Sequence, residues 1–145
     1  MSSNAKSARE KFGFRLDLQS GVPVYRQLID QVQAGIAAGT LTLGEQLPTV
    51  RQVSVDLAIN PNTVMRAYRE MEIRGITETQ QGTGTFVAQR KMQRTDAEHD
   101  RQLQQLVSEF VARAGAGGFR LNELIQALRE RASHVEHTTG EEHTP

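Results

Sequence analysis

The residues best suited to chemistry in this sequence are amide, guanidinium and hydroxyl side chains, which act through hydrogen bonds. They are concentrated between residues 51 and 69. The members of this set are Arg51, Asn60, Asn62, Thr63, Arg66 and Arg69. An asparagine amide can pair with the N6 and N7 edge of adenine, and guanidinium and hydroxyl groups can bind phosphate oxygens. Side chains of these types can therefore recognise a nucleic acid through noncovalent contacts, if the fold places them on one surface.

Histidines offer a different chemistry, the binding of a metal ion. The four histidines are His99, His134, His137 and His143. The His134-x-x-His137 spacing, with Glu136 beside it and further glutamates downstream, could hold zinc or nickel. A solvated acidic tail with scattered histidines has the same composition, and we favour that interpretation. We expect no metal site and no cofactor, and keep regulation by a tail-bound metal as an alternative.

Covalent catalysis has little support. The chain has no cysteine, which excludes disulfides, cysteine-ligated zinc and thiol catalysis. No Ser-His-Asp pattern and no Walker-type phosphate loop is present. We therefore predict that the protein is not an enzyme. The 17 basic residues balance the 17 acidic ones, so any nucleic-acid interface depends on where residues lie rather than on bulk charge.

The N-terminal sequence lacks the apolar segment of a secretory signal, and no run approaches the roughly 18 apolar residues that a membrane helix needs. We therefore expect a cytoplasmic protein that does not insert into membranes.

The elements that must position the polar residues are mostly helices. Apolar spacing and capping signals predict three helices at about 23–39, 49–57 and 60–75. Two short strands are expected at 76–79 and 85–88, joined by a glycine-bearing loop at 80–84. Two further helices are expected between 95 and 132, separated by a glycine-rich stretch. Helix, tight turn, helix and hairpin in this order is typical of a winged helix-turn-helix.

Two further expectations concern the ends of the chain. The alternation of Phe14, Leu16 and Leu18 with polar residues predicts a short strand before the first helix. The expected domain boundaries are a flexible arm at 1–11, a winged helix-turn-helix domain at 12–90, a two-helix dimerisation tail at 95–132 and a disordered tail at 133–145.

Several motifs resemble one protein family, over about residues 14–88. They are Pro23-Val24-Tyr25-x-Gln27-Leu28, Leu47-Pro48-Thr49-Val50-Arg51, the run from Asn60 to Met71, Gly75-Ile76, and Gly82-Thr83-Gly84-Thr85-Phe86-Val87. In this order and spacing they resemble GntR-family bacterial transcription regulators. The Asn-Pro-Asn-Thr-Val run and the short tail resemble the YtrA subfamily. That resemblance implies a homodimeric repressor of an operon for a transporter or other membrane protein, bound to a palindromic operator.

The expected DNA-binding residues lie on the second and third helices and in the hairpin loop. They are Arg51, Asn60, Asn62, Thr63, Arg66, Arg69, Thr83 and Gly84. Plainer roles stay open: Asn60 as a helix cap and Thr63 as a packing residue. Arg66 and Arg69 could instead be surface charges or ion-pair partners of Glu70. The glycine-bearing loop could be a plain hairpin turn that binds no ligand.

The expected dimerisation residues form two apolar stripes in the tail. They are Leu103, Leu106, Val107, Phe110, Leu121, Leu124, Ile125 and Leu128. The alternative is that the two stripes merely pack on each other. A winged helix used only for protein contacts is the alternative function, and an unidentified small-molecule effector is left open as a partner.

Overall fold

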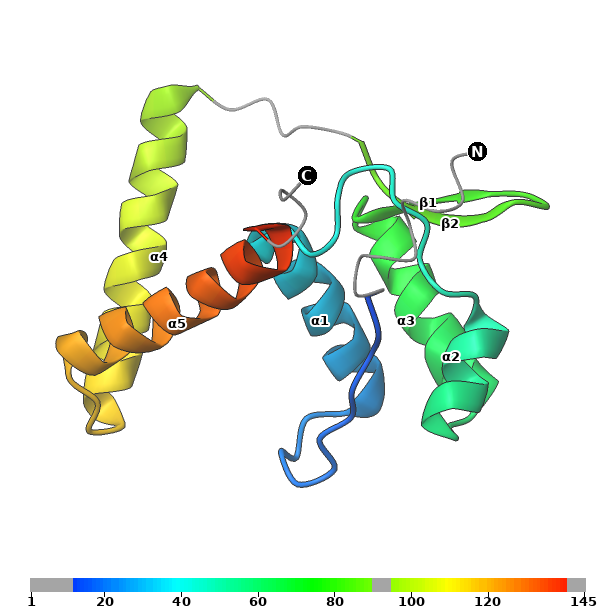
Figure 1. Ribbon diagram of the computed structural model, residues 1–145, viewed down its shortest axis with the longest axis horizontal. Helices are drawn as coiled ribbons and strands as arrows, with labels where there is room; N and C mark the ends of the chain where they lie inside the picture. The colour runs from blue at the N-terminus through cyan, green and yellow to red at the C-terminus, as the bar shows by residue number, and fades with distance from the viewer. Residues whose placement is uncertain (1–11, 90–94, 141–145) are drawn as a thin grey trace. The chain divides into compact units, whose positions relative to one another are not determined.

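The computed structural model describes residues 12–89 and 95–140, with side chains described as far as residue 133. The chain divides into two compact units, one ending at Gln89 and the other beginning at Arg90. Within the described residues, the first unit contains three helices and a two-stranded hairpin, and the second contains two helices (Figure 1). The mainly helical architecture with one small hairpin agrees with the expected fold class.

The helices of the first unit begin and end where local signals predict. Their bounds are Val24–Ala38 for α1, Val50–Leu57 for α2 and Pro61–Ile73 for α3. Gly39 ends α1 in the left-handed conformation, with φ 82°. Thr49 and Gln52 form a complete capping box at the start of α2. Asn60 caps α3, with Pro61 as its first residue.

The turn between α2 and α3 is tight because Ala58 adopts a left-handed conformation, with φ 52°. The amide of Ile59 then donates to the carbonyl of Ser54 at 3.1 Å. This turn brings the inner face of α3 onto the core of the unit. The buried residues on that face are Val64, Ala67, Tyr68 and Met71, as the helical spacing predicts.

The hairpin consists of β1, Thr77–Gln80, and β2, Gly84–Val87, paired antiparallel with Thr77 opposite Val87. Each strand is shifted by one residue from its expected position. The hairpin extends away from the three helices of the first unit (Figure 1). The segment 44–47 runs along the outer edge of β2, where Gln46 forms an isolated antiparallel bridge with Phe86.

The strand predicted around Phe14, Leu16 and Leu18 does not form. The segment is extended, but two glutamine side chains of α1 satisfy its backbone groups in place of a neighbouring strand. Gln31 Oε1 accepts from the Arg15 amide at 2.9 Å, and Gln27 Oε1 accepts from the Asp17 amide at 2.9 Å. The apolar alternation therefore reflects partial burial of an extended segment rather than strand pairing. Phe14 lies in the core, Leu16 packs against it, and Leu18 is exposed.

The second unit consists of α4, Asp96–Ala116, and α5, Leu121–Gly140. Thr95 and Glu98 cap α4 with a capping box, as predicted. α5 continues to Gly140, eight residues past the expected end of the two-helix tail at residue 132, while residues 141–145 and 1–11 lie outside the described residues. Among the described helices, none is long and apolar enough to cross a membrane.

Candidate nucleic-acid interface

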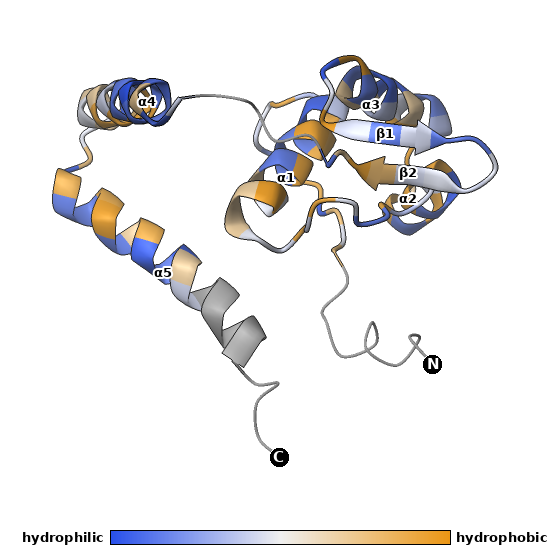
Figure 2. Ribbon diagram, turned by 90° about the horizontal axis from the view of Figure 1, so that it is seen from above, coloured by the Kyte–Doolittle hydropathy of each residue, from blue (hydrophilic) through white to orange (hydrophobic). Residues whose placement is uncertain are grey.

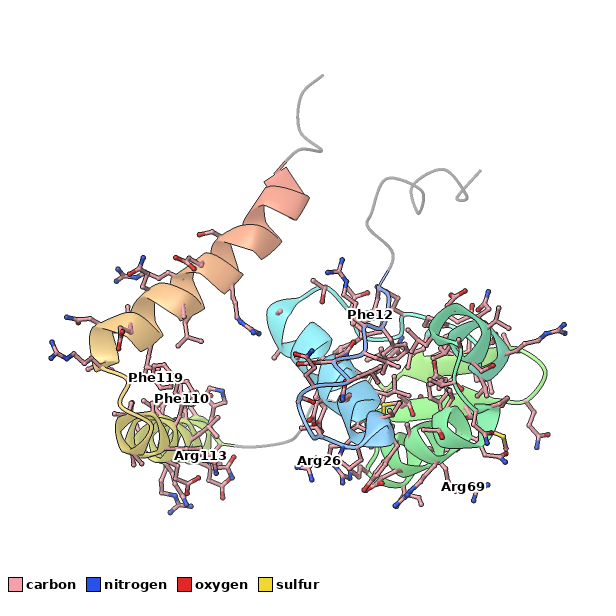
Figure 3. The ribbon with its side chains drawn as sticks, turned by 90° about the horizontal axis from the view of Figure 1, so that it is seen from below. Phe12, Arg26, Arg69, Phe110, Arg113 and Phe119 are labelled. Carbon is pink, nitrogen blue, oxygen red and sulfur yellow. The ribbon has the colours of Figure 1, made fainter. Side chains whose placement is uncertain are left out.

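The outer ridge of α3 presents polar groups directly opposite its buried face. Because successive residues turn by about 100° around a helix, a spacing of four, three and four residues keeps side chains on one side. The outer ridge consists of Asn62, Arg66, Arg69 and Ile73, all exposed. Arg69 projects outward from the first unit (Figure 3). This ridge can meet a partner without disturbing the core.

The first turn of α3 gives its two asparagines different roles. Asn60 Oδ1 accepts a hydrogen bond from the Asn62 amide at 2.9 Å, so the plain capping role of Asn60 is present. The side chain of Asn62 is exposed and makes no hydrogen bond within the described part of the chain. Thr63 is half-buried. The side-chain amide of Asn62, unlike its backbone amide, is therefore available to an outside partner.

The arginines of α3 do not pair with the acid expected as their alternative partner. Glu70 instead binds Arg74, with 2.6 Å between Oε1 and Nη2, and among the described residues it pairs with neither Arg66 nor Arg69. The Arg66 guanidinium lies over the ring of Tyr25, 3.9 Å from its centroid. These side chains border an open hollow of about 310 Å³, lined by Arg66, Arg69, Glu70, Ile73 and Arg74.

Arg51 lies in the first turn of α2, exposed, where no acidic residue accompanies it. A cation there opposes the helix dipole, so a nearby anion would stabilise it. The neighbouring Pro48 carbonyl accepts a hydrogen bond from the Tyr68 hydroxyl. Burial raises the pKa of the Tyr68 phenol, which therefore stays protonated as a donor. This bond ties the segment before α2 to the inner face of α3.

The hairpin loop presents small residues at its tip. Thr83 is exposed and Gly84 is half-buried. Gly84 has φ 140°, a conformation that L side chains rarely adopt. Its missing side chain also leaves space for Gln46, whose Nε2 would lie 2.5 Å from a Cβ at this position.

Most of the alternative metal site falls on side chains that are not described. In the described part of the chain, no group of three or more histidine, aspartate or glutamate residues could hold a metal ion. His99 is described, and its nearest acidic partner is Asp100, at 3.6 Å. The side chains of His134, His137 and His143 lie outside the described residues.

The predicted dimerisation residues are largely exposed within a single chain. Leu106 is 63% and Leu128 55% exposed, and Phe110 and Phe119 lie near the connection between α4 and α5 (Figure 3). The half-buried member of the predicted set is Leu124. Hydrophobic and hydrophilic bands alternate along α5 (Figure 2). The packing of the two stripes on each other therefore leaves most of their apolar surface uncovered.

Two residues of this region are missing from the set expected from sequence. Ile73 is 78% exposed on the outer ridge of α3, and its spacing from Arg66 and Arg69 could have revealed it. Gln46 contacts the hairpin loop from 37 residues away, and no local pattern signals such a contact.

Comparison with known proteins decides the family. Residues 24–87 match the model described as bacterial regulatory proteins, gntR family. The chain is 34% identical over 111 residues to the HTH-type transcriptional regulator YhcF of Bacillus subtilis, covering 77% of this chain and 91% of that protein. The chain belongs to the GntR family. It therefore belongs to a family of DNA-binding transcription regulators, and the family model matches the region from the start of α1 to the end of β2.

Two further members place this GntR-family chain more closely. It is 29% identical over 121 residues to the HTH-type transcriptional repressor YtrA of Bacillus subtilis, covering 83% of this chain and 93% of the repressor. A solved GntR family transcriptional regulator from Listeria monocytogenes superposes with a TM-score of 0.55 at 27% identity, covering 79% of this chain and 98% of that one. The chain is thus similar to YtrA over most of its length.

Proposed function

We propose that this GntR-family regulator is a homodimeric repressor that binds a palindromic operator with α3 in the major groove. The observation that carries the proposal is the outer ridge of α3, where Asn62, Arg66 and Arg69 are exposed opposite a face that is completely packed. An α-helix fits the major groove, where each base pair presents a distinct pattern of donors and acceptors. The ridge has donors suited to read that pattern.

The proposed contacts divide by chemistry. Asn62 reads a base edge from the first turn of α3, because its amide can pair with adenine. Arg51, Arg66, Arg69 and Thr83 bind phosphates, which fix the register on the duplex. Asn60 and Thr63 sit at a helix N-terminus, where backbone amides favour an anion. The full proposed set is Arg51, Asn60, Asn62, Thr63, Arg66, Arg69, Thr83 and Gly84.

The two-helix unit is the proposed dimerisation region. One winged helix makes few DNA contacts, and a two-fold dimer doubles them on a palindrome. The exposed apolar side chains of α4 and α5 support this proposal, because a two-helix hairpin alone buries little of its own surface. The proposed interface consists of Leu103, Leu106, Val107, Phe110, Leu121, Leu124, Ile125 and Leu128.

The target genes follow from the family resemblance alone. We expect the operator to lie upstream of an operon for a transporter or other membrane protein, and the repressor to act in the cytoplasm. Mapping the selected operator sequence onto the source genome checks this expectation.

Selection of duplexes from a random-sequence pool with the wild-type protein tests the proposal. The best duplex is then titrated by fluorescence anisotropy at about 50 and 200 mM salt, because phosphate contacts make affinity fall steeply with salt. We expect a palindromic motif, a preference over scrambled DNA at both salt concentrations, and a molar mass twice the 16.1 kDa of one chain. A monomer that enriches no sequence would contradict the proposal and favour a winged helix used for protein contacts.

A further inference from the structure

We propose that Gln46 is a positioning residue that holds the β1–β2 hairpin loop ready for contact with DNA, a role that rests on the function proposed above. Gln46 lies in the segment between α1 and α2, outside both the helix–turn–helix and the hairpin. Its side chain nevertheless reaches the loop tip: Nε2 donates to the Thr83 carbonyl at 3.0 Å.

The backbone around Gln46 is fixed, so its side chain starts from a defined point. The Gly44 amide donates to the Val87 carbonyl, and the Leu47 amide donates to the Thr85 carbonyl, each at 2.8 Å. The segment 44–47 thereby forms an outer edge along β2. A two-stranded hairpin alone is marginally stable in water, so this third edge supports it.

The loop is shaped to receive the Gln46 amide. Gly84 lies against it, and a Cβ at that position would come within 2.5 Å of Gln46 Nε2. The loop also has a turn bond of its own, from the Thr83 amide to the Gln80 carbonyl at 3.1 Å. Gln46 adds a second hydrogen bond from outside the hairpin, to the carbonyl of the same Thr83 residue.

The two residues that follow this segment contact the two helices of the helix–turn–helix. Pro48 accepts from the Tyr68 hydroxyl on α3, and Thr49 caps α2. Gln46 therefore links the hairpin loop to the stretch of chain that contacts α3 and caps α2. Because a loop that is ordered before binding loses less conformational entropy on binding, the tie favours contact between the loop and DNA.

The substitution Gln46→Met tests the role, because methionine keeps the length of the side chain and removes the donor. The matched control is Gln89→Met, since Gln89 lies against Gly44, at the other end of the same segment. Two quantities are measured: amide hydrogen exchange of residues 81–85 in the free protein, and affinity for the selected duplex across a salt series.

For Gln46→Met we expect faster exchange in the loop and about fivefold weaker binding, the effect of one neutral hydrogen bond. We also expect a shallower dependence on salt, by about 0.9 in the log–log slope for each phosphate that the variant no longer binds. Gln89→Met should match the wild type in loop exchange, affinity and salt dependence. A change in binding without faster loop exchange would overturn positioning in favour of a direct DNA contact by Gln46.

Unchanged binding by Gln46→Met, or equal effects from Gln89→Met, would overturn the positioning role while leaving the proposed function intact. Failure of the wild type to prefer any duplex would instead overturn the proposed function, and with it the DNA role of Gln46.

Discussion

At the start of α3, two asparagines two positions apart differ in what their side chains already bind. The Asn60 oxygen is occupied by the cap, whereas the Asn62 side chain is exposed. The cap uses the Asn62 backbone amide, which any residue except proline supplies. Replacing the Asn62 side chain should therefore alter recognition without unfolding the helix.

We expect Asn62→Ala to lose about 1–3 kcal/mol of discrimination at one base pair in each half-site, which is the contribution of one bidentate pair. Repeating the duplex selection with the variant should show a relaxed preference at that position. Asn122→Ala is the matched control, because Asn122 is likewise the second residue of its helix. An unchanged preference in the Asn62 variant would remove this residue from base recognition.

A buried hydroxyl in the hairpin carries a prediction about stability. Thr77 is 1% exposed, and its Oγ1 has no hydrogen-bond partner among the described residues. Thr77→Val keeps the shape and removes the unpaired group, so we expect the free energy of unfolding to rise by about 1 kcal/mol. Thr79→Val, exposed on the same strand, should change it by less than about 0.5 kcal/mol. Denaturant unfolding measures the stability of both variants. A destabilised Thr77 variant would show that the hydroxyl does form a hydrogen bond in the folded protein.

Among the elements, the N-terminal segment before α1 has its backbone groups hydrogen-bonded by side chains of α1 rather than by a neighbouring strand. Gln27 accepts from the Asp17 amide and donates to the Asp17 carbonyl, each at 2.9 Å, and also donates to the Val22 carbonyl at 2.8 Å. Its side chain thus replaces the ladder bonds that a neighbouring strand would supply. Gln27 itself is 9% exposed, so these bonds lie largely out of water.

We expect Gln27→Met to lower the free energy of unfolding by about 2 kcal/mol, because several partly buried backbone groups lose their partner. Gln33→Met, on the exposed side of the same helix, should change it by less than about 0.5 kcal/mol. Thermal or urea unfolding compares the two variants. Equal stabilities would mean that water replaces the glutamine amide at no cost.

The elements also show what could be predicted from sequence. Capping boxes act over three residues, so Thr49 and Thr95 mark the starts of their helices correctly. The exposure of Asn62 likewise follows from the spacing of the buried face of α3. Contacts that span the chain have no such signal.

Three contacts in the first unit could not be predicted from local sequence patterns. The alternation around Leu16 indicated burial but not which groups would bond the backbone, and the glutamines of α1 fill that role. The bond between Gln46 and the hairpin loop joins residues 37 apart. The ion pair of Glu70 with Arg74, rather than with Arg66 or Arg69, also depends on side-chain geometry that sequence spacing alone does not determine.

For the whole molecule, the exposed stripe of α4 carries the prediction about assembly. Phe110 is 46% exposed on the apolar face, and Ser108 lies on the opposite side of the same helix. We expect Phe110→Glu to produce monomers, because a carboxylate buried between apolar faces would be strongly destabilised. Ser108→Glu adds the same charge and should leave the dimer intact. Sedimentation equilibrium distinguishes these results, and a dimeric Phe110 variant would place the interface elsewhere.

Operator recognition by a two-fold dimer is tested most directly by one comparison of affinities. The wild-type protein is titrated into the selected duplex and into a copy in which one half-site is scrambled. Scrambling one half-site should weaken binding by at least about tenfold, because each mismatched base pair costs about 1–3 kcal/mol. The intact duplex should bind two chains. Equal affinity for both duplexes, or one chain bound to the intact one, would contradict dimeric recognition of a palindrome.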